Sequence, residues 1–380
     1  MTDYPRFRPV AVQTDLDFRN HHGARQVDLA FRIADWWLQG RRETAARQVF
    51  RWGRQAIVPP MRLASIIALG LWASAFAAEG QEWPSKPLTA VIPFAAGSVT
   101  DVVPRVVFEQ LSQQLGHNII VENRPGAGST TAASQVAKAD PDGYTILVNS
   151  SAHTIAPALY PKVTYDPIRD FVPVAPLGVV PSLVVVPADR GFKTLADFIA
   201  AAKQKPGAMN FASAGVGTAT HLGAVRFQLS AGIQAAHVPF KGGPESMGEV
   251  IAGRIDYFLA PVGVARSHVK DGKVTALAVN TPKRVAALPD VPTMSEAGLV
   301  NAEYKFWLGM FLPATTPRSI VDKLERETFK ALATKSVKDK LAALSIEPMA
   351  MTSAAFGAYI EKEIVADAAL VKAAGIKAQY

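Results

Sequence analysis

The stretch PFAAGSVTD, Pro93 to Asp101, joins the apolar run LTAVI to VVPRVVFEQLSQQL, a segment with helical periodicity. A loop of small residues therefore stands where a strand ends and a helix begins. The first N–H groups of a helix lack partners and carry partial positive charge. Small residues let an anion approach these groups without a lysine or arginine. Taken alone, the loop is explained more simply by Ser98, Thr100 and Asp101 capping the helix.

A second unit with the same order of elements lies at residues 208–240, AMNFASAGVGTATHLGAVRFQLSAGIQAAHVPF. Both units are interpreted as strand, small-residue loop, amphipathic helix and strand, although their residue identity is low. Apolar runs alternate with helical segments from Pro87 onward, which indicates α/β layering. Ligands collect at the carboxyl ends of strands in open α/β sheets. Two such loops across a cleft would hold a small carboxylate from both sides, and the binding and capping interpretations both stay open.

Composition describes a globular chain with no cysteine chemistry. The 380 residues are 49% hydrophobic and 19% charged, enough for two ordinary domains. The absence of cysteine excludes disulfides, thiolate catalysis and cysteine metal sites. The net charge of +8 is concentrated early, because arginine is dense and lysine absent before Lys86. The remainder is near charge balance, so we expect no nucleic-acid partner.

Residues 61–77 have the pattern of a signal peptide. Met61 and Arg62 form a positive start, an apolar run follows to Trp72, and Ala75-Phe76-Ala77 supplies the cleavage pattern. The run is shorter than the ~20 residues of a membrane span. We therefore predict export, with cleavage near Ala77, and interpret residues 1–60 as a non-native upstream extension, disordered or loosely helical. The alternative is a genuine N-terminal extension or a retained membrane anchor.

No motif for catalysis, cofactor binding or metal binding stands out. The chain has no Walker loop, GxGxxG fingerprint, GxSxG elbow or HExxH, and GAGST at 126–130 lacks the phosphate-loop spacing. His221 follows Ser213 by eight residues, but this pair has no third member. We therefore predict no catalytic residue, no cofactor and no metal site.

From Trp83 to its C-terminus the chain resembles the substrate-binding proteins of tripartite tricarboxylate transporters, the Bug-type extracytoplasmic solute receptors. The resemblance is carried by motifs in order along the chain, among them NRPGAGS, PDGYT, NFASAGVGTATHLGAVRF, VPFKGG and LPDVPT. The first loop reads AAGSVTD where the family often has Pro-Gly-Gly or Ala-Gly-Gly. The segment Ser150–His153 also departs from the commoner Thr-His form. Ligand preferences of the family are therefore not transferred.

The resemblance implies an α/β, two-lobed receptor of periplasmic-binding-protein type II, or Venus flytrap, fold. Lobe I would combine residues 84–185 with 306–380, and lobe II would span 186–305. The implied receptor is a periplasmic monomer, not an enzyme. It would capture a small organic anion and deliver it to a two-component membrane permease. Mono- and dicarboxylates, amino acids and aromatic acids are all bound by similar receptors.

The site residues that the resemblance implies come from both lobes. They are, in lobe I, Phe94, Ala95, Ala96, Gly97, Ser98, Asp101, Ser151, Ala152 and His153, and, in lobe II, Ser213, Gly215, Gly217, Thr218, His221, Phe240, Lys241 and Gly242. Two alternatives remain open at this point. The loaded receptor could dock on a histidine-kinase ectodomain as a sensor, or the chain could be a secreted α/β hydrolase using Ser213 or Ser98 with His221.

Overall fold

The computed structural model describes residues 82–379 of the chain. The predicted signal peptide at 61–77 and the predicted extension at 1–60 lie outside the described residues. The described residues belong to one compact unit, Gln81–Tyr380. None of its described helices is both long and apolar enough to cross a membrane.

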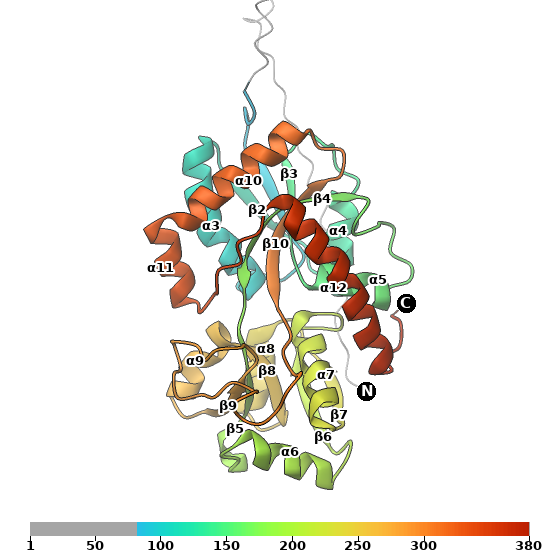
Figure 1. The fold of residues 1–380 in the computed structure, drawn as a ribbon, viewed down its shortest axis with the longest axis vertical. Coiled ribbons are helices and arrows are strands. Elements are labelled where there is room, and N and C mark those ends of the chain that lie inside the picture. Colours follow the sequence, from blue (N-terminus) through green and yellow to red (C-terminus); the bar gives the residue numbers. More distant parts are fainter. Residues whose placement is uncertain (1–81, 380) are drawn as a thin grey trace, which may run out of the picture. The chain divides into compact units, whose positions relative to one another are not determined.

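Sheet A has five strands in the order β2-β1-β3-β10-β4 (Figure 1). Strand β1 pairs in parallel with β2 and β3, and β10 runs antiparallel between β3 and β4. The strands are β1 (Leu88–Ile92), β2 (Ile119–Asn123), β3 (Thr145–Ser150), β4 (Phe171–Val179) and β10 (Trp307–Pro313).

Both faces of sheet A are buried, as the alternation along β10 shows. Leu308, Met310 and Leu312 pack in one apolar cluster, whereas Trp307 and Phe311 pack in another on the opposite face. Helices α3 (Val99–Leu115), α10 (Arg318–Ala333) and α11 (Lys335–Ala343) contribute to the first cluster. Helices α4 (Thr130–Val136) and α12 (Ser353–Ala373) contribute to the second, with α5 (Ala152–Leu159) beside α12.

Sheet B repeats the plan of sheet A, with the order β7-β6-β8-β5-β9. Its strands are β5 (Ser182–Pro187), β6 (Met209–Ser213), β7 (Ala235–Pro239), β8 (Tyr257–Pro261) and β9 (Val274–Val279). Helices α6 (Leu195–Gln204) and α7 (Ala219–Ala231) pack on one face, and α8 (Gly243–Ile251) and α9 (Val262–Lys270) on the other. In each sheet, the strand that opens the repeated unit pairs in parallel with a strand on either side. This strand is β1 in sheet A and β6 in sheet B.

The two sheets confirm the predicted α/β class and place the two repeated units in equivalent positions. The unit β1-α3-β2 in sheet A corresponds to β6-α7-β7 in sheet B. The chain passes from one sheet to the other at Val180–Pro181, so the boundary predicted after residue 185 falls inside β5. It returns after β9, and the two connections touch where the Val180 N–H donates to Phe306 O at 2.7 Å.

Strand β4 is an element that the sequence pattern did not predict. It contains Pro173 and Pro176, and proline is uncommon inside a strand because it lacks a backbone donor. Proline is tolerated at a sheet edge because one side of an edge strand needs no ladder hydrogen bonds. Strand β4 is the edge strand of sheet A, paired on one side with β10 through an irregular register.

Candidate ligand-binding site

The loop between β1 and α3 is fixed by a buried carboxylate. Asp101, 3% exposed, accepts the Gly97 N–H on Oδ2 at 2.9 Å. Its Oδ1 accepts from Arg105 Nε and from Asn123 Nδ2, both at 2.9 Å. Asn123 Nδ2 also lies 3.0 Å from Phe94 O. Asp101 therefore shapes the loop rather than facing a ligand, because Gly97 lies two residues before the first residue of α3.

The start of α3 nevertheless keeps free donors. Within residues 82–379 no acceptor is in hydrogen-bond geometry with the N–H groups of Val99 and Thr100. Ser98, the residue before the helix, makes no capping hydrogen bond, and its buried Oγ has no partner among the described residues. The capping interpretation is therefore not supported for Ser98, and Asp101 holds the loop before the helix rather than the first helix amides.

The corresponding loop in sheet B, Ser213–Thr218 between β6 and α7, is held by hydroxyl groups. Thr218 Oγ1 donates to Gly215 O at 2.8 Å, and Thr220 Oγ1 accepts the Ala214 N–H at 2.9 Å. The N–H groups of Ala219 and Thr220, the first two of α7, have no acceptor in the described part of the chain. Two helices from two sheets thus begin with unpaired amides.

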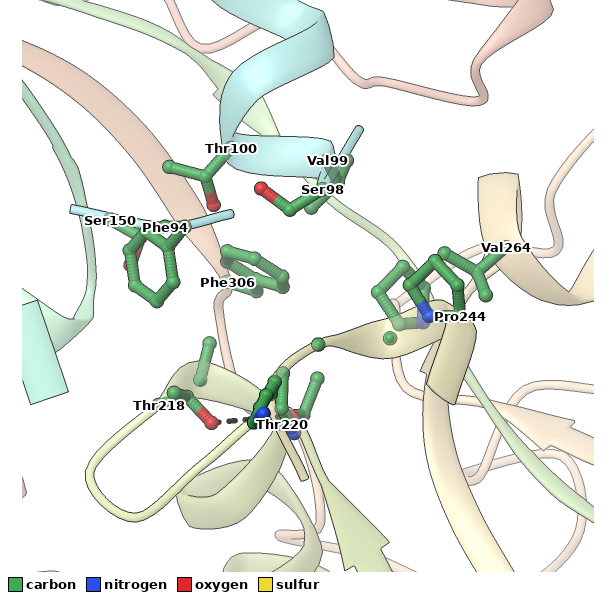
Figure 2. Close-up of a pocket in the computed structure, with 16 residues that line it drawn as sticks. Phe94, Ser98, Val99, Thr100, Ser150, Thr218, Thr220, Pro244, Val264 and Phe306 are labelled. Carbon is green, nitrogen blue, oxygen red and sulfur yellow. Dashed lines mark hydrogen bonds between the residues drawn. The ribbon is translucent and has the colours of Figure 1, made fainter. Parts of the chain in front are cut away.

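Both helix starts line one cavity, of about 40 Å³. Figure 2 shows Ser98, which precedes α3, and Thr100 of α3 across this inner cavity from Thr218 and Thr220, with Phe306 between the two pairs. The first residues of α8 and α9 complete the wall. A volume of this size holds a few waters or a group such as a carboxylate. The lining residues are Phe94, Ser98, Val99, Thr100, Ser150, Ala214, Thr218, Ala219, Thr220, Lys241, Gly242, Gly243, Pro244, Pro261, Val264 and Phe306.

A larger outer cavity, of about 580 Å³, shares Phe94, Ala214, Thr218 and Lys241 with the inner one. Lys241 is the sole charged side chain that lines either cavity in the described residues, and its ammonium group forms no ion pair there. Four helix starts and one cation favour a small anion. The remaining walls are Pro93, Ala95, Pro125, Gly126, Ala127, Gly128, Ser129, Tyr160, Gly215, Val216 and Gln379.

Residues 103–376 match the family model described as "Tripartite tricarboxylate transporter family receptor". The chain belongs to this family. A curated relative from Pseudomonas sp. strain P51, the UPF0065 protein in the tcbD-tcbE intergenic region, is 38% identical over 288 residues, which cover 75% of this chain and 86% of the relative. The predicted membership of the Bug-type receptors is thereby confirmed.

Solved structures of such receptors match the two-sheet fold over almost their whole length. The periplasmic binding protein BugD is 33% identical, with a TM-score of 0.73, covering 78% of this chain and 100% of that one. Rpa4515 of R. palustris with adipate is 30% identical, with a TM-score of 0.74 and coverage of 78% and 100%. MatC of Rhodopseudomonas palustris with bound malate is 32% identical, with a TM-score of 0.71 and coverage of 76% and 100%. The receptor therefore has the type II two-domain fold.

Seven of the seventeen site residues predicted for this receptor line the two cavities. They are Phe94, Ala95, Ser98, Gly215, Thr218, Lys241 and Gly242. Ala96, Gly97, Gly217 and Phe240 belong to the same loops but line neither cavity. Whether any of these side chains binds a ligand stays a prediction.

The segment Ser151–His153 does not line the cavities. Ser151, Ala152 and His153 are fully buried. The His153 ring stacks on Phe311 at 4.4 Å between ring centroids, and its Nε2 lies 3.0 Å from Pro167 O. Burial lowers the pKa of His153 to about 4, so it is neutral and part of the aromatic core. We therefore leave these three residues out of the proposed site.

The structure brings to the cavities several residues that the sequence argument missed. Ser150, one residue before the predicted segment, ends β3, and Pro261 ends β8. Gly243 and Val264 belong to the first turns of α8 and α9. The sequence did contain a signal for these residues. Ligands collect at the carboxyl ends of all parallel strands, but the prediction applied this rule only to the two repeated units.

Ser213 does not have the surroundings of a hydrolase nucleophile. Its Oγ lies 2.6 Å from Nε2 of His237, not of His221, and it also bonds Gly215 O at 3.0 Å. The residue is fully buried, so a substrate cannot reach Oγ. His221 Nδ1 accepts the Gly217 N–H at 3.3 Å instead of facing Ser213. This geometry gives the hydrolase hypothesis no support.

Proposed function

We propose that this receptor captures a small organic carboxylate outside the cytoplasm and delivers it to a tripartite tricarboxylate-type membrane transporter. Lobe I is formed by sheet A with its helices, and lobe II by sheet B with its helices. One observation carries the proposal. Helices α3 and α7, one from each lobe, begin at the same cavity with amides that have no acceptor among residues 82–379.

The ligand carboxylate occupies the inner cavity in this proposal. Its oxygens accept from the amides of Val99 and Thr100 on one side and from those of Ala219 and Thr220 on the other. Hydrogen bonds from backbone N–H groups to an ionised carboxylate are stronger than neutral ones. The rest of the ligand extends into the outer cavity, where Lys241 meets a second polar or anionic group. Adipate and malate, named with two similar receptors, are dicarboxylates and so carry a second anionic group.

Capture and release follow from bonds that span both lobes. A ligand that bonds to both helix starts favours the closed arrangement, because an open arrangement breaks half of its bonds. The closed arrangement is the one a permease would recognise. Delivery to two membrane partners and residence in the periplasm after export belong to the same proposal and are supported by family membership. Action as a monomer is part of the proposal as well. No step needs a chemical reaction.

A thermal-shift screen of organic acids against the full chain tests the proposal. The panel contains malate, adipate, citrate, one amino acid and one aromatic acid. A true ligand at 100 times its dissociation constant adds roughly 2.7 kcal/mol to the free energy of unfolding. We expect at least one acid to raise the melting temperature. A panel without any shift would contradict capture of a carboxylate.

The variant Val99→Pro tests the role of the helix amides. Proline removes the Val99 N–H but is favoured at the first position of a helix. Ser98 has φ −67° and ψ 159°, the conformation that a residue before proline adopts. We expect the melting temperature to change little and the dissociation constant of the bound acid to rise by about tenfold or more, since a bond to a charged acceptor is lost. Val99→Ala, which keeps the N–H, is the control. Equal affinity of both variants would exclude the Val99 amide from the site.

A further inference from the structure

The loop Ser213–Thr218 has a front that lines the cavities and a back that rests on two histidines. On the front, Gly215 and Thr218 line the outer cavity, and Thr218 also lines the inner one. On the back lie His221 of α7 and His237 of β7. Neither histidine lines either of the two cavities.

Each histidine holds a different part of the loop. Nδ1 of His221 accepts the Gly217 N–H at 3.3 Å. Nε2 of His237 lies 2.6 Å from Ser213 Oγ, which accepts the Gly215 N–H at 3.1 Å and donates to Gly215 O at 3.0 Å. The two imidazoles therefore fix both glycines of the loop, one directly and one through Ser213.

The His221 contact requires a neutral imidazole with its proton on Nε2, because a protonated Nδ1 cannot accept a hydrogen bond. The surroundings keep both rings in the neutral form. Burial lowers the pKa of His221 to about 3, with a further contribution from His237, and lowers that of His237 to about 4. At the pH of any ordinary extracytoplasmic compartment the acceptor is therefore available.

The rings also hold one another in place. His221 and His237 stack with 3.9 Å between ring centroids and 12° between planes, and Phe211 stacks on His237 at 4.8 Å. Phe211 belongs to β6, the strand that leads into the loop. A stack of three rings, anchored in two strands and one helix, leaves each nitrogen little freedom to turn away from its partner.

A further cavity explains why the contacts matter. It has a volume of about 500 Å³ and lies behind the loop, lined by the rings of Phe211, His221 and His237. Water in this cavity would compete for the amides of Gly215 and Gly217 if the imidazoles were removed. Val216 and Gln379 line both this rear cavity and the outer one, so the loop forms part of the wall between them.

We propose that His221 and His237 are positioning residues of the ligand site, which hold the loop Ser213–Thr218 from behind so that the amides at the start of α7 face the ligand. The effect on affinity rests on the function proposed above. The effect on the loop itself does not, because the hydrogen bonds exist without a ligand.

Four variants of the full chain distinguish a positioning role of the histidine nitrogens from a packing role of the side-chain volume. His221→Leu and His237→Leu replace the imidazole with an apolar side chain and so remove the hydrogen-bonding nitrogens. His221→Asn places an oxygen near the position of Nδ1, and His237→Gln places a polar atom near that of Nε2. Amide hydrogen exchange of residues 213–221 is measured without ligand, and dissociation constants are measured with malate and with adipate.

We expect exchange of the Gly217 amide to be about tenfold faster in His221→Leu and near wild type in His221→Asn. We expect the dissociation constant to rise by about five- to tenfold in each leucine variant, as for the loss of one hydrogen bond, and by less than about threefold in the asparagine and glutamine variants. Recovery by the polar variants distinguishes positioning from a purely packing role.

Two controls account for stability and cavity shape. Phe227→Leu destabilises the core of α7 without touching the loop, and Leu229→Ala enlarges the rear cavity at its exposed edge. Both should leave the dissociation constant at the wild-type value. A Phe227→Leu variant that weakens binding as much as His221→Leu would overturn the proposal.

The outcomes for the two proposals differ. If wild type binds an acid and the leucine variants bind it equally well, the positioning role is wrong and the capture function stands. If wild type binds neither acid, only the exchange of the Gly217 amide tests the positioning role. Faster exchange in His221→Leu, with near wild-type exchange in His221→Asn, would support it. Unchanged exchange in His221→Leu would refute it.

Discussion

The two ligand loops have the same place in the fold but are held by opposite kinds of group. The loop of lobe I is fixed by an ionic network, in which Asp101 bonds to Gly97, Asn123 and Arg105. The loop of lobe II is fixed by neutral imidazoles and hydroxyls. The difference follows access to water. Arg105 is 46% exposed and keeps its charge solvated, whereas His221 is buried and His237 is half-buried.

The two units share the same order of strands and helices, but different side chains hold their loops in place. Both loops present helix amides to one cavity, and that front is what an anion would meet. On the side of each loop that faces away from the cavity, a charged group is tolerated only where its ion-pair partner reaches solvent, because burying an isolated charge is costly.

Removing Asp101 should have the largest effect on stability. Asp101→Ala leaves the Gly97 N–H, Asn123 and Arg105 without their acceptor in a nearly buried site. We expect a loss of about 3 kcal/mol in the free energy of unfolding by urea, more than for His221→Leu, which leaves one amide unpaired. A loss in Asp101→Ala no larger than in His221→Leu would break the comparison.

The control for this prediction is an ion pair at the surface. Lys335 and Asp339 form an exposed pair one helical turn apart in α11. Asp339→Ala should cost less than about 0.5 kcal/mol. A large cost there would mean that ion pairs in general, rather than the buried position of Asp101, determine the result.

A second prediction concerns Asp367 of α12. We expect this buried carboxyl to be neutral, as we expect of any buried titratable group without an ion-pair partner. Asp367 is 2% exposed and forms no ion pair among the described residues. Burial, with the nearby charge of Glu363, raises its pKa to about 7, while bonds from Thr154 and Tyr304 and the charge of Arg226 oppose the rise. Thr154 Oγ1 lies 2.6 Å from Asp367 Oδ2 and 2.8 Å from Ser151 O. One hydroxyl has one proton, so both bonds form together only when Asp367 is protonated.

The sign of the pH effect follows from linkage. The folded state holds the Asp367 proton up to about pH 7, whereas the unfolded state releases it near the ordinary aspartate pKa of ~4. The stabilisation from Asp367 is therefore complete below about pH 4 and is lost as the pH rises through 7. A shift of this size corresponds to at most about 4 kcal/mol.

Asp367→Asn isolates this contribution, since asparagine imitates the protonated carboxyl. The gain in melting temperature of Asp367→Asn over wild type should be larger at pH 8 than at pH 4.5. His221 and His237 have lowered pKa values and act in the opposite direction, but they are common to both proteins and cancel in the difference. A gain independent of pH would show that Asp367 is ionised in the folded state and would break the rule.

Much of the fold was predictable because local and tertiary signals agree in it. The segments β1, β6 and β10 are apolar runs whose alternation matches their two buried faces, and α3 and α7 each follow a loop of small residues. Strand β4 was missed because its prolines act locally as breakers, whereas its edge position, a tertiary property, removes the penalty.

The candidate site was predictable only at its front. A small-residue loop before a helix predicts free amides from sequence alone, and Ser98 and Thr218 lie where this argument placed them. The backs of the loops were not predictable. His237 follows Ser213 by 24 residues on a neighbouring strand, so its contact depends on the parallel pairing of β6 with β7. His153 has a polar side chain in a loop-like context, yet aromatic rings from three elements enclose it.

The smallest expected effects come from the loop glycines, and they test how closely each loop is enclosed by neighbouring side chains. Gly97 and Gly217 both have positive φ, 79° and 75°, so alanine is strained by about 1 kcal/mol at either position. A Cβ on Gly97 would meet nothing within 4 Å, whereas one on Gly217 would lie 3.2 Å from the Tyr160 ring and 3.3 Å from Leu159. We expect Gly97→Ala to cost about 1 kcal/mol in urea denaturation and Gly217→Ala about 2.

Gly248 provides the control, because it lies within α8 with open space around it and no positive φ. Gly248→Ala should stabilise the protein by up to about 1 kcal/mol, since alanine is the better helix former. If Gly97→Ala were the more damaging of the two loop variants, the lobe I loop would be the more tightly enclosed one. The contacts of Tyr160 and Leu159 with the lobe II loop would then not be what limits substitution at Gly217.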